Sequence, residues 1–490
     1  MKLSQLLSKA KTPHQIFGDA EISNVAIDSR LVKSGDIFFA LLGKTQDGSK
    51  FIADAISKGA AAIVTSQDQE ISGAISIKTS DVFSLLVEVL KEFYSPLPSN
   101  IYAITGTNGK TSSAEFTRQI LQFLGKKSAS IGTLGTRAHH DIEAQLQTSS
   151  LTTPDIVSLY KNLSILKKNA VDDVAIEVSS IGLEQGRIAG LKIDVASFTN
   201  FTQDHLDYHK SMEQYFFCKM ILFKDVLPSG SNAVINADIK EFSDIKKICA
   251  QKNHHIIDYG FKAEILRIKK IAPHDLGQKV FFEFDGNDFE FDLEVSGDFQ
   301  AFNALCALGN VLAKNKISAQ KLREILQKFP TLKPAEGRMQ RAAILPNKAQ
   351  VFIDFAHTPD ALENVLKLAQ SLGKRVLVLF GCGGDRDAKK RPIMGEIACR
   401  LADQVIVTDD NPRSENAAQV RSEILAACDM KKTFQFEDRK LAIEKAIAML
   451  QPHDILILAG KGHEKYQIIG EKKFEFDEEK IVKNALRGTS

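Results

Sequence analysis

A glycine-rich segment followed by lysine and threonine carries the residue types that most directly indicate chemistry. The segment Gly106-Thr-Asn-Gly-Lys-Thr111 comes directly after a short apolar run that ends at Thr105. Glycines let backbone N–H groups approach phosphate oxygens, and the start of a helix adds positive potential. Lys110 can reach terminal phosphates, and the Thr111 hydroxyl can hold Mg²⁺. The glycines are closer together than in the general phosphate-loop pattern, but the combination argues against an ordinary turn with a solvated lysine.

Acidic and histidine side chains follow two further apolar runs, where they can meet a metal ion. Glu177 ends one run, and its apolar neighbours argue against a surface glutamate. A carboxylate there can ligate Mg²⁺ together with phosphate oxygens. The loop after the next run contains Asp204, His205, Asp207 and His209. From the residues alone this loop can be a zinc site or a solvated polar turn, and zinc is disfavoured because no thiolate accompanies the histidines.

Lys219 lies in an otherwise apolar helical stretch, Tyr215-Phe-Phe-Cys-Lys-Met-Ile-Leu-Phe. A lysine in such a stretch usually extends its ammonium group to water. The chemical alternative is an amine that loses its proton, combines with CO₂ and ligates Mg²⁺ as a carbamate. The residues alone favour the extended, solvated lysine.

Three polar loops containing Gly or Pro follow apolar runs in the last third of the chain: Gly381 to Asp387, Asp409 to Arg413 and Gly460 to Glu464. If the runs are parallel strands of one sheet, the loops emerge at the same edge, where open α/β sheets bind ligands. Arg386, Arg413 and Glu464 could then clamp a small molecule that carries both carboxylate and ammonium groups. Separate solvated loops are a plausible alternative for any one of them, but a poor one for all three.

Apolar strands alternating with helical segments indicate an α/β protein that positions these groups at strand ends. We expect three domains: a small N-terminal α/β substrate domain (1–97), a central P-loop-type, mostly parallel ATP-binding sheet (98–332) and a C-terminal Rossmann-like domain (333–490). The first boundary lies within a Pro- and Ser-containing stretch at 94–100, which has the composition of a linker. Residues 264–297 change to alternation, which predicts an antiparallel annex in the central domain.

Composition excludes several classes of protein. The 490 residues carry 63 Lys and Arg against 61 Asp and Glu, so no global basic field for nucleic acid exists. The six cysteines are scattered without a Cys-x-x-Cys pair, which indicates reduced, buried thiols. The N-terminus lacks the apolar run of a signal peptide, and no stretch is long enough to span a bilayer. We therefore expect a cytoplasmic protein, with neither membrane nor nucleic acid as partner. We also expect a monomer, although composition does not determine the oligomeric state.

Nine short strings, in order, resemble the Mur ligase family of ATP-dependent amide-forming enzymes over essentially the whole chain. The strings are Asp28-Ser-Arg30, Gly106-Thr-Asn-Gly-Lys-Thr111, Thr152-Thr-Pro154, Glu177-Val-Ser-Ser180, Asp204-His-Leu-Asp-Tyr-His209, Gly337-Arg-Met339, Asp354-Phe-Ala-His-Thr-Pro359, Asp410-Asn-Pro-Arg413 and Gly460-Lys-Gly-His-Glu464. The resemblance is greatest to the members that add diaminopimelate in peptidoglycan synthesis.

The resemblance implies a role for each matching position. The uridine-nucleotide pocket would comprise Ser29, Arg30, Lys44, Thr45 and Gln46. The muramoyl dipeptide would be held by Thr152, Thr153, Ser179, Gln185 and Arg187. ATP would be bound by Gly106, Thr107, Asn108, Gly109, Lys110, Thr111, Ser112, Asn303, Arg338 and Asp354. Mg²⁺ would be held by Thr111, Glu177, His205 and Lys219, the last as a CO₂-derived carbamate, which reverses the expectation from the residues alone. The catalytic set would be Lys110, Glu177, His205 and Lys219. Diaminopimelate would be bound by Arg386, Asp410, Asn411, Pro412, Arg413, Gly460 and Glu464.

Arg413 decides which amino acid the resemblance implies. The diaminopimelate-adding members have Asp-Asn-Pro-Arg, and the lysine-adding members lack the arginine. Diaminopimelate carries a distal carboxylate that an arginine fork can pair, whereas Arg413 left unpaired would disfavour lysine. The alternatives are the lysine-adding ligase, a folate polyglutamate ligase and a non-catalytic nucleotide-binding scaffold. Four positions depart from the family pattern: Leu151, Ile181, Gln300 and Phe355.

The implied reaction has two steps and small-molecule substrates only. The γ-carboxylate of D-Glu in UDP-N-acetylmuramoyl-L-Ala-D-Glu attacks the γ-phosphate of ATP, giving an acyl phosphate and ADP. The amine of meso-2,6-diaminopimelate then attacks the acyl carbon, and phosphate leaves. Lys110 and Mg²⁺ would offset charge on the transferring group.

Overall fold

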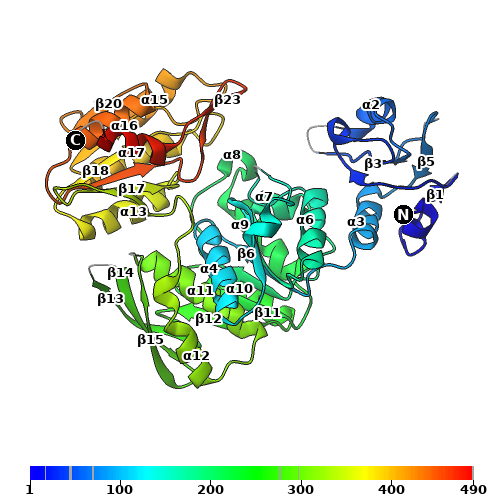
Figure 1. The fold of residues 1–490 in the computed structure, drawn as a ribbon, viewed down its shortest axis with the longest axis horizontal. Coiled ribbons are helices and arrows are strands. Elements are labelled where there is room, and N and C mark those ends of the chain that lie inside the picture. The colour runs from blue at the N-terminus through cyan, green and yellow to red at the C-terminus, as the bar shows by residue number, and fades with distance from the viewer. Residues whose placement is uncertain are drawn as a thin grey trace. The chain divides into compact units, whose positions relative to one another are not determined.

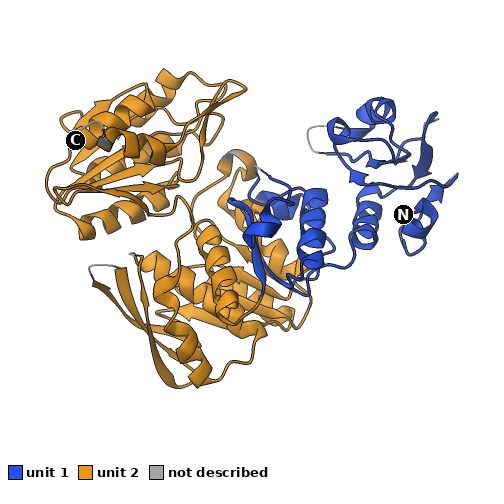
Figure 2. Ribbon diagram, in the orientation of Figure 1, with its two compact units in different colours: residues 1–101, 127–174, 181–193 blue, residues 102–126, 175–180, 194–490 orange. Residues whose placement is uncertain are grey.

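The computed structural model describes residues 1–16, 18–43, 47–68, 71–149, 151–274, 277–295 and 297–487. The chain forms two compact units. The first comprises residues 1–101, 127–174 and 181–193, and the second comprises residues 102–126, 175–180 and 194–490 (Figure 2). Strands β6 (Asn100–Thr105) and β9 (Asp173–Glu177) and helix α7 (Ser180–Glu184) contain residues of both units.

The first unit is built on a sheet with the strand order β1-β5-β4-β3-β2. The strands are β1 (Gln15–Ile16), β2 (Val25–Ala26), β3 (Ile37–Phe39), β4 (Ala62–Thr65) and β5 (Ile75–Lys78). Strands β2 to β5 are parallel and β1 is antiparallel. The unit also contains α1 (Leu3–Leu7), α2 (Ile52–Ser57), α3 (Val82–Phe93), α5 (His140–Glu143), α6 (Ile156–Lys168) and the hairpin β7 (Ser128–Gly132) to β8 (Gly135–Arg137). Asp81 and Asp155 start α3 and α6 because each side chain accepts a hydrogen bond from a backbone N–H group of the first turn.

The second unit contains a sheet with the strand order β15-β14-β13-β12-β11-β10-β6-β9. Strands β10 (Val195–Phe198), β11 (Asn232–Asn236) and β12 (His255–Gly260) continue the parallel pairing of β6. Strand β14 (Gly277–Phe284) pairs antiparallel with both β13 (Leu266–His274) and β15 (Asn287–Leu293), which confirms the predicted annex. Helices α4 (Lys110–Phe123) and α11 (Asp298–Lys314) pack against each other beside this sheet (Figure 1). The other helices of this region are α8 (Leu206–His209), α9 (Met212–Ile221), α10 (Phe242–Gln251) and α12 (Ala319–Leu326).

The last part of the chain forms a second parallel sheet with the order β16-β17-β21-β18-β19-β20. Its strands are β16 (Gln340–Ile344), β17 (Gln350–Asp354), β18 (Val376–Phe380), β19 (Gln404–Val407), β20 (Thr433–Gln435) and β21 (Ile455–Ala459), and only β16 is antiparallel among these described strands. Helices α13 (Pro359–Leu372), α14 (Lys390–Leu401) and α15 (Ala417–Leu425) contribute to the apolar cluster that contains Val378 and Ile457. Helices α16 (Arg439–Ala448) and α17 (Glu478–Arg487) contribute to the cluster that contains Leu379 and Leu458. The central strands are continuous apolar runs because helices bury both faces of a parallel sheet. A hairpin, β22 (Tyr466–Ile469) with β23 (Lys472–Glu475), follows β21.

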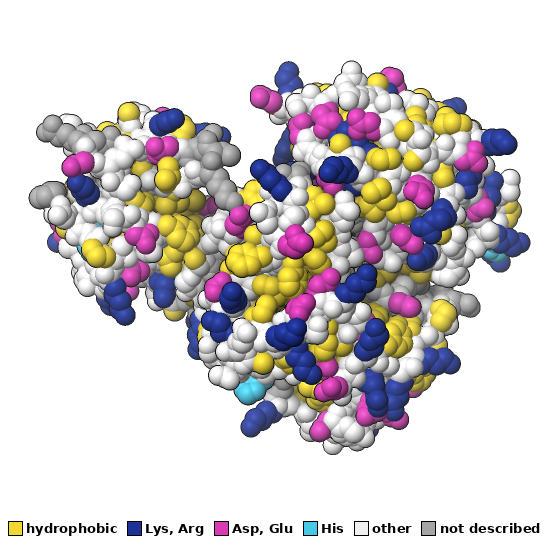
Figure 3. All heavy atoms as spheres, turned by 180° about the vertical axis from the view of Figure 1, so that it is seen from behind, with side chains coloured by type: hydrophobic (Ala, Val, Ile, Leu, Met, Phe, Trp, Pro, Cys, Tyr) yellow, Lys and Arg dark blue, Asp and Glu magenta, His cyan; other side chains and the backbone are white. Residues whose placement is uncertain are grey.

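The surface and the cysteines agree with the balanced composition. Basic and acidic side chains are interspersed on the face shown in Figure 3. All six cysteines are free thiols; four are buried as predicted, whereas Cys399 and Cys428 are half-exposed. Among the described residues, no helix has both the length and the apolarity needed to cross a membrane.

Candidate active site

The glycine-rich segment forms a tight loop between β6 and the first turn of α4. Gly106 and Gly109 have positive φ angles of 143° and 83°. A Cβ atom at Gly106 would lie 2.0 Å from Thr199 Oγ1, and one at Gly109 would lie 2.4 Å from Asn303 Oδ1. Both positions therefore require glycine for their backbone conformation and for the space beside them. The loop delivers Lys110 to the helix N-terminus, where backbone N–H groups and the helix dipole favour an anion.

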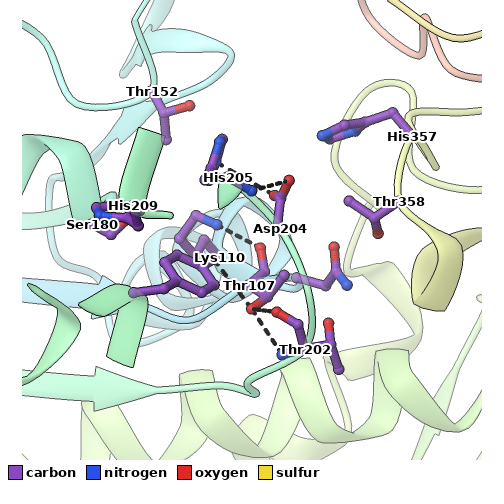
Figure 4. Close-up of polar contacts among 12 residues, drawn as sticks. Thr107, Lys110, Thr152, Ser180, Thr202, Asp204, His205, His209, His357 and Thr358 are labelled. Carbon is purple, nitrogen blue, oxygen red and sulfur yellow. Dashed lines mark hydrogen bonds and ion pairs between the residues drawn. The ribbon is translucent and has the colours of Figure 1, made fainter. Parts of the chain in front are cut away.

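Lys110 folds back over the loop. Its Nζ donates hydrogen bonds to the carbonyl oxygens of Gly106, at 2.9 Å, and Thr107, at 2.7 Å (Figure 4). Removal from water lowers the pKa of Lys110, and the charges of Glu177 and Asp204 partly oppose this effect. Thr107 Oγ1 in turn lies 3.1 Å from the carbonyl oxygen of Thr202. The ammonium group is thus held at the phosphate-wrapping loop, with anionic groups close by.

Thr111 and Glu177 meet at the carboxyl ends of β6 and β9. The Thr111 hydroxyl donates to Glu177 Oε2 at 2.9 Å, and the Arg338 guanidinium donates to Thr111 Oγ1 at 3.3 Å. Glu177 is 2% exposed, so the possibility of a surface glutamate is excluded. A hydroxyl and a carboxylate are the hard oxygen donors that Mg²⁺ takes alongside phosphate oxygens and water.

Asp204 and His205 lie in the loop that follows β10. His205 has φ 54°, and its Nε2 lies 3.4 Å from Asp204 Oδ2 (Figure 4). Burial would raise the pKa of Asp204, but the charges of His205, His357, Lys390 and Lys110 outweigh it and bring the pKa to about 2. Asp204 therefore stays ionised, because these positively charged groups surround it. Burial also lowers the pKa of His357 to about 4, with Lys390 acting in the same direction.

The remaining histidine of this loop is part of the protein interior. His209 is 3% exposed, and its Nε2 lies 2.8 Å from Ser180 Oγ. His209 is therefore not part of a solvated polar turn, which was one of the two alternatives that the residues alone allowed.

Lys219 differs from the solvated lysine that its apolar surroundings indicate. The side chain is 1% exposed, and Nζ donates to the Gly106 carbonyl oxygen at 2.8 Å. The ammonium also lies 4.4 Å from the centre of the Tyr215 ring. Burial, together with the charge of Lys110, lowers the pKa of Lys219 well below its usual value. The expectation from the residues alone was wrong because α9 directs this side chain under the phosphate loop, a tertiary contact that local sequence does not contain.

A cleft of about 320 Å³ lies next to the phosphate loop. Its lining includes seven of the residues predicted to bind ATP: Asn108, Gly109, Thr111, Ser112, Asn303, Arg338 and Asp354. Tyr259, Phe299 and Phe302 add aromatic surface that suits a purine ring. Asp354 accepts hydrogen bonds from the N–H groups of Met339, at 2.6 Å, and Ala356, at 2.7 Å. Burial raises the pKa of Asp354, and Arg338 opposes that rise.

One departure from the family pattern, Gln300, lines this cleft, and another, Phe355, packs against the lining residue Arg338. Gln300 is fully buried, and its Oε1 accepts a hydrogen bond from Asn303 Nδ2 at 3.2 Å. The guanidinium carbon of Arg338 lies 4.7 Å from the centre of the Phe355 ring. An arginine can stack on phenylalanine as well as on tyrosine, so the substitution preserves this support.

The first unit contains a larger cleft, of about 1220 Å³. Ser29 and Arg30 line it, together with the basic residues Lys33, Lys161 and Lys168. The Arg30 guanidinium binds the Asp28 carboxylate at 2.6 Å but remains largely exposed. The predicted positions Lys44, Thr45 and Gln46 lie outside the described residues.

The residues predicted to hold the muramoyl dipeptide fall into both units. In the first unit, Arg187 donates to the Thr153 carbonyl oxygen at 2.7 Å and to Gln185 Oε1 at 2.7 Å. Thr152 Oγ1 accepts a hydrogen bond from the Thr133 hydroxyl at 3.2 Å. Ser179 belongs to the second unit, where it follows β9. The structure therefore brings Thr153, Gln185 and Arg187 together.

The three polar loops of the last sheet emerge at one edge, as predicted, because β18, β19 and β21 are parallel neighbours. Arg413 has φ 52°, and its Nη1 donates to the Gly384 carbonyl oxygen at 2.7 Å. A Cβ atom at Gly383 would lie 2.7 Å from Arg413 Nη1 and 3.7 Å from Arg386 Cγ. Burial lowers the pKa of Arg413, and the neighbouring Arg386 lowers it further. Arg386 and Arg413 thus lie close together near Gly383, and their combined positive charge favours an anionic ligand.

Acidic and amide groups occupy the other side of this site. Asn411 Nδ2 donates to Glu464 Oε2 at 2.8 Å. Burial raises the pKa of Glu464, and the Asp410 carboxylate raises it further. Gly460, with φ 112°, brings the chain past Asp410, and the Pro412 carbonyl oxygen packs against Gly384. The seven residues predicted for diaminopimelate therefore lie in one cluster that offers both cationic and anionic groups.

Sequence reasoning missed two residues of these sites, Lys461 and Asp360. Lys461 is fully buried beneath Asp410 and Asn411, although only Gly460 and Glu464 of its string received a role. Asp360 accepts a hydrogen bond from Asn108 Nδ2 at 2.9 Å. Lys461 could have been found, because it is a lysine flanked by glycines directly after an apolar strand. The sequence contains no signal for Asp360, because its contact with Asn108 joins residues far apart in the chain.

Family models match three successive segments of the chain. They are described as Mur ligase family, catalytic domain (residues 21–93), Mur ligase middle domain (104–311) and Mur ligase, glutamate ligase domain (337–462). The chain belongs to the Mur ligase family and has its three-domain α/β architecture. The family comprises ATP-dependent ligases.

Individual relatives are similar along the whole chain. A protein of Chelativorans sp. (strain BNC1) named UDP-N-acetylmuramoyl-L-alanyl-D-glutamate–2,6-diaminopimelate ligase is 42% identical over 489 residues, 99% of each chain. A protein of Brucella melitensis with the same name is 40% identical over 96% of this chain and 95% of its own. A solved structure of a ligase of that name is 30% identical, with a TM-score of 0.65, over 96% of this chain and 95% of that one.

Proposed function

We propose that this protein is an ATP-dependent ligase that adds meso-2,6-diaminopimelate to the D-Glu residue of UDP-N-acetylmuramoyl-L-Ala-D-Glu in peptidoglycan synthesis. The observation that carries the proposal is the cluster at the edge of the last sheet. There Arg386 and Arg413 lie close together near Gly383, and the hydrogen-bonded pair Asn411 and Glu464 belongs to the same cluster. Diaminopimelate presents a carboxylate and an ammonium group at each end, which such a mixed cluster can bind. Relatives with that activity in their names support the same substrate.

The ATP half of the reaction would use the phosphate loop. Lys110 and the N–H groups at the start of α4 would receive the phosphates, and the aromatic residues of the 320 Å³ cleft would receive the base. The D-Glu γ-carboxylate would displace ADP from the γ-phosphoryl group, and Lys110 would offset the charge that spreads over the transferring oxygens. The amine would then displace phosphate from the acyl carbon. Positioning therefore carries most of the catalysis, and no covalent nucleophile of the protein is needed.

The oxygen donors near the loop fit Mg²⁺. Thr111 and Glu177 are in hydrogen-bond contact, and the carboxylate is buried where phosphate oxygens would lie. With His205 they would hold the ion, which neutralises phosphate charge when bound.

Lys219 would complete this set as a carbamate. Its depressed pKa favours the neutral amine, which can attack CO₂ to give R–NH–COO⁻ and release one proton. The product is an oxygen anion in place of an ammonium group, which makes the side chain a metal ligand rather than a repulsive charge.

The first unit would bind the nucleotide-sugar. Ser29 and Arg30 line its large cleft, and the lysines there suit a diphosphate. Thr152, Thr153, Ser179, Gln185 and Arg187 would hold the muramoyl dipeptide. We further propose domain boundaries near 97 and 332, a monomeric state and a cytoplasmic location, where ATP and the nucleotide-sugar are available.

The proposal is tested by phosphate release from ATP with a panel of amino acids, with and without the uridine-linked dipeptide. We expect release only when ATP, the dipeptide and diaminopimelate are all present. Faster turnover with lysine at equal concentration would identify the lysine-adding ligase instead. Absence of release with every amino acid would identify a nucleotide-binding scaffold.

Replacing Arg413 with alanine should weaken diaminopimelate binding selectively. A lost charge-assisted pair costs about 1.5–3 kcal/mol, so we expect KM for diaminopimelate to rise about 10- to 100-fold. KM for ATP should be unchanged, because Arg413 is on the amino-acid loop. Steady-state kinetics with each substrate varied in turn measures this. Arg400→Ala, which removes an exposed arginine paired with Glu363, is the matched control. Equal KM values for diaminopimelate in both variants would contradict the role of Arg413.

A further inference from the structure

Lys461 is a fully buried lysine beneath the amino-acid site. It follows β21 and is 0% exposed. Its Nζ lies 3.1 Å from Asp410 Oδ1, 3.0 Å from Asn411 Oδ1 and 3.6 Å from Glu464 Oε2. A buried ammonium group is costly unless it is paired and hydrogen-bonded. Here all of its close polar partners named above belong to the cluster that would bind the amino acid, so the charge is placed to act on that cluster.

The lysine fixes the orientation of the Asn411 amide. Asn411 Oδ1 accepts hydrogen bonds from Lys461 Nζ and from the Ile468 N–H group, at 2.9 Å. Two donors on one side of the amide identify that atom as the oxygen. The Nδ2 group must then point the other way, where it donates to Glu464 Oε2. Without the ammonium group, one of the two interactions that select this orientation is lost.

The lysine also offsets two neighbouring carboxylates. Burial raises the pKa of Glu464, and Asp410 raises it further, whereas Lys461, the Asn411 hydrogen bond and Arg413 lower it. Tyr466, whose own pKa is raised by burial and by Glu464, faces the same group. Like charges in one buried site favour protonation of one of them. Among the described groups named here that lower the pKa of Glu464, Lys461 is the only lysine, and it is fully buried.

We propose that Lys461 is a positioning residue of the amino-acid site, an inference that rests on the proposed function. Its ammonium group orients Asn411 and keeps the Glu464 carboxylate ionised and aimed, so that Glu464 can receive an ammonium group of diaminopimelate. Lys461 does not itself touch the substrate in this assignment. The competing explanation is that Lys461 only supports the folding of the last sheet.

The test is Lys461→Met, which keeps the length of the side chain and removes the charge. We expect KM for diaminopimelate to rise about tenfold, with KM for ATP and for the uridine-linked dipeptide unchanged. The acid limb of kcat/KM for diaminopimelate should move to higher pH, because Glu464 loses a group that lowers its pKa. Lys465→Met is the matched control, since Lys465 is 58% exposed and pairs with Glu336. A purely structural role would lower thermal stability and active enzyme concentration without moving the acid limb.

A second variant, Asp410→Asn with Lys461→Met, keeps the inference testable even if the single variant folds poorly. In this double variant the Asp410 carboxylate is replaced by an amide, so no carboxylate is left without its lysine partner. The amide also no longer repels the Glu464 carboxylate, which removes a cause of the raised Glu464 pKa. We expect the acid limb to return toward the wild-type position while KM for diaminopimelate stays raised. A wild-type KM in the double variant, or an unmoved acid limb in folded Lys461→Met, would overturn the inference. Failure of wild-type enzyme to use diaminopimelate would instead overturn the proposed function, so the two failures are distinct.

Discussion

Lys110→Ala is expected to lower kcat for ATP-dependent amide formation by about 10³-fold or more, the scale of losing a cation that stabilises phosphoryl transfer. The ammonium group is held against the loop carbonyls of Gly106 and Thr107, at the N-terminus of α4. In the proposed complex it would turn from those carbonyls to the phosphate oxygens. Alanine keeps the helix but leaves the transferring charge without its nearest cation.

Single-turnover measurement of acyl transfer, with a separate ATP-binding titration, checks this prediction. The loss should appear in the chemical step, because cleft residues that hold the base remain. Lys247→Ala is the matched control, as Lys247 is an exposed lysine that pairs only weakly with Asp244 at 3.0 Å on α10. Near-normal turnover by folded Lys110→Ala would contradict the assignment of this loop.

Much of the fold could be predicted because its strongest signals are local. Runs such as Val376 to Phe380 and Ile455 to Ala459 are uninterrupted apolar segments, which parallel strands covered on both faces require. After residue 264 the sequence changes to alternating apolar and polar residues. This change predicted the antiparallel strands, because one face of such strands is more exposed than the other. Strand order and the division into two units arise from contacts between distant segments, and the sequence contains no local signal for them.

The candidate site was predictable where strand ends determine it. Thr111 and Glu177 meet because Thr111 closely follows β6 and Glu177 ends the neighbouring strand β9, so their positions along the sequence sufficed. Lys219 was not predictable from its surroundings, because whether a lysine in an apolar helix reaches water depends on what the helix packs against. Lys461 was missed for a related reason: its burial is created by the loop of Asp410, a different segment of the chain.

Lys219→Ala is expected to reduce kcat by about 10²- to 10³-fold, in the range observed when one preorganised electrostatic group is removed. The proposed carbamate would place an anion within reach of the loop that binds phosphate, at the position where Nζ now contacts the Gly106 carbonyl oxygen at 2.8 Å. Alanine removes that anion and leaves an empty space in a fully buried site. The loss should be larger when Mg²⁺ is limiting, because one of its ligands is gone.

Small carboxylates separate this chemical role from a structural one. Acetate or propionate can enter the vacated space and supply the missing anion, so either should restore part of the activity of Lys219→Ala and none of that of Lys110→Ala. Lys224→Ala, which removes an exposed lysine further along the same segment, should need no rescue. Native mass spectrometry of the wild-type protein should detect an added CO₂ that Lys219→Ala lacks. A folded Lys219→Ala variant that binds ATP yet ignores carboxylates would contradict the carbamate, and would leave Lys219 as a cation that supports the loop through Gly106 alone.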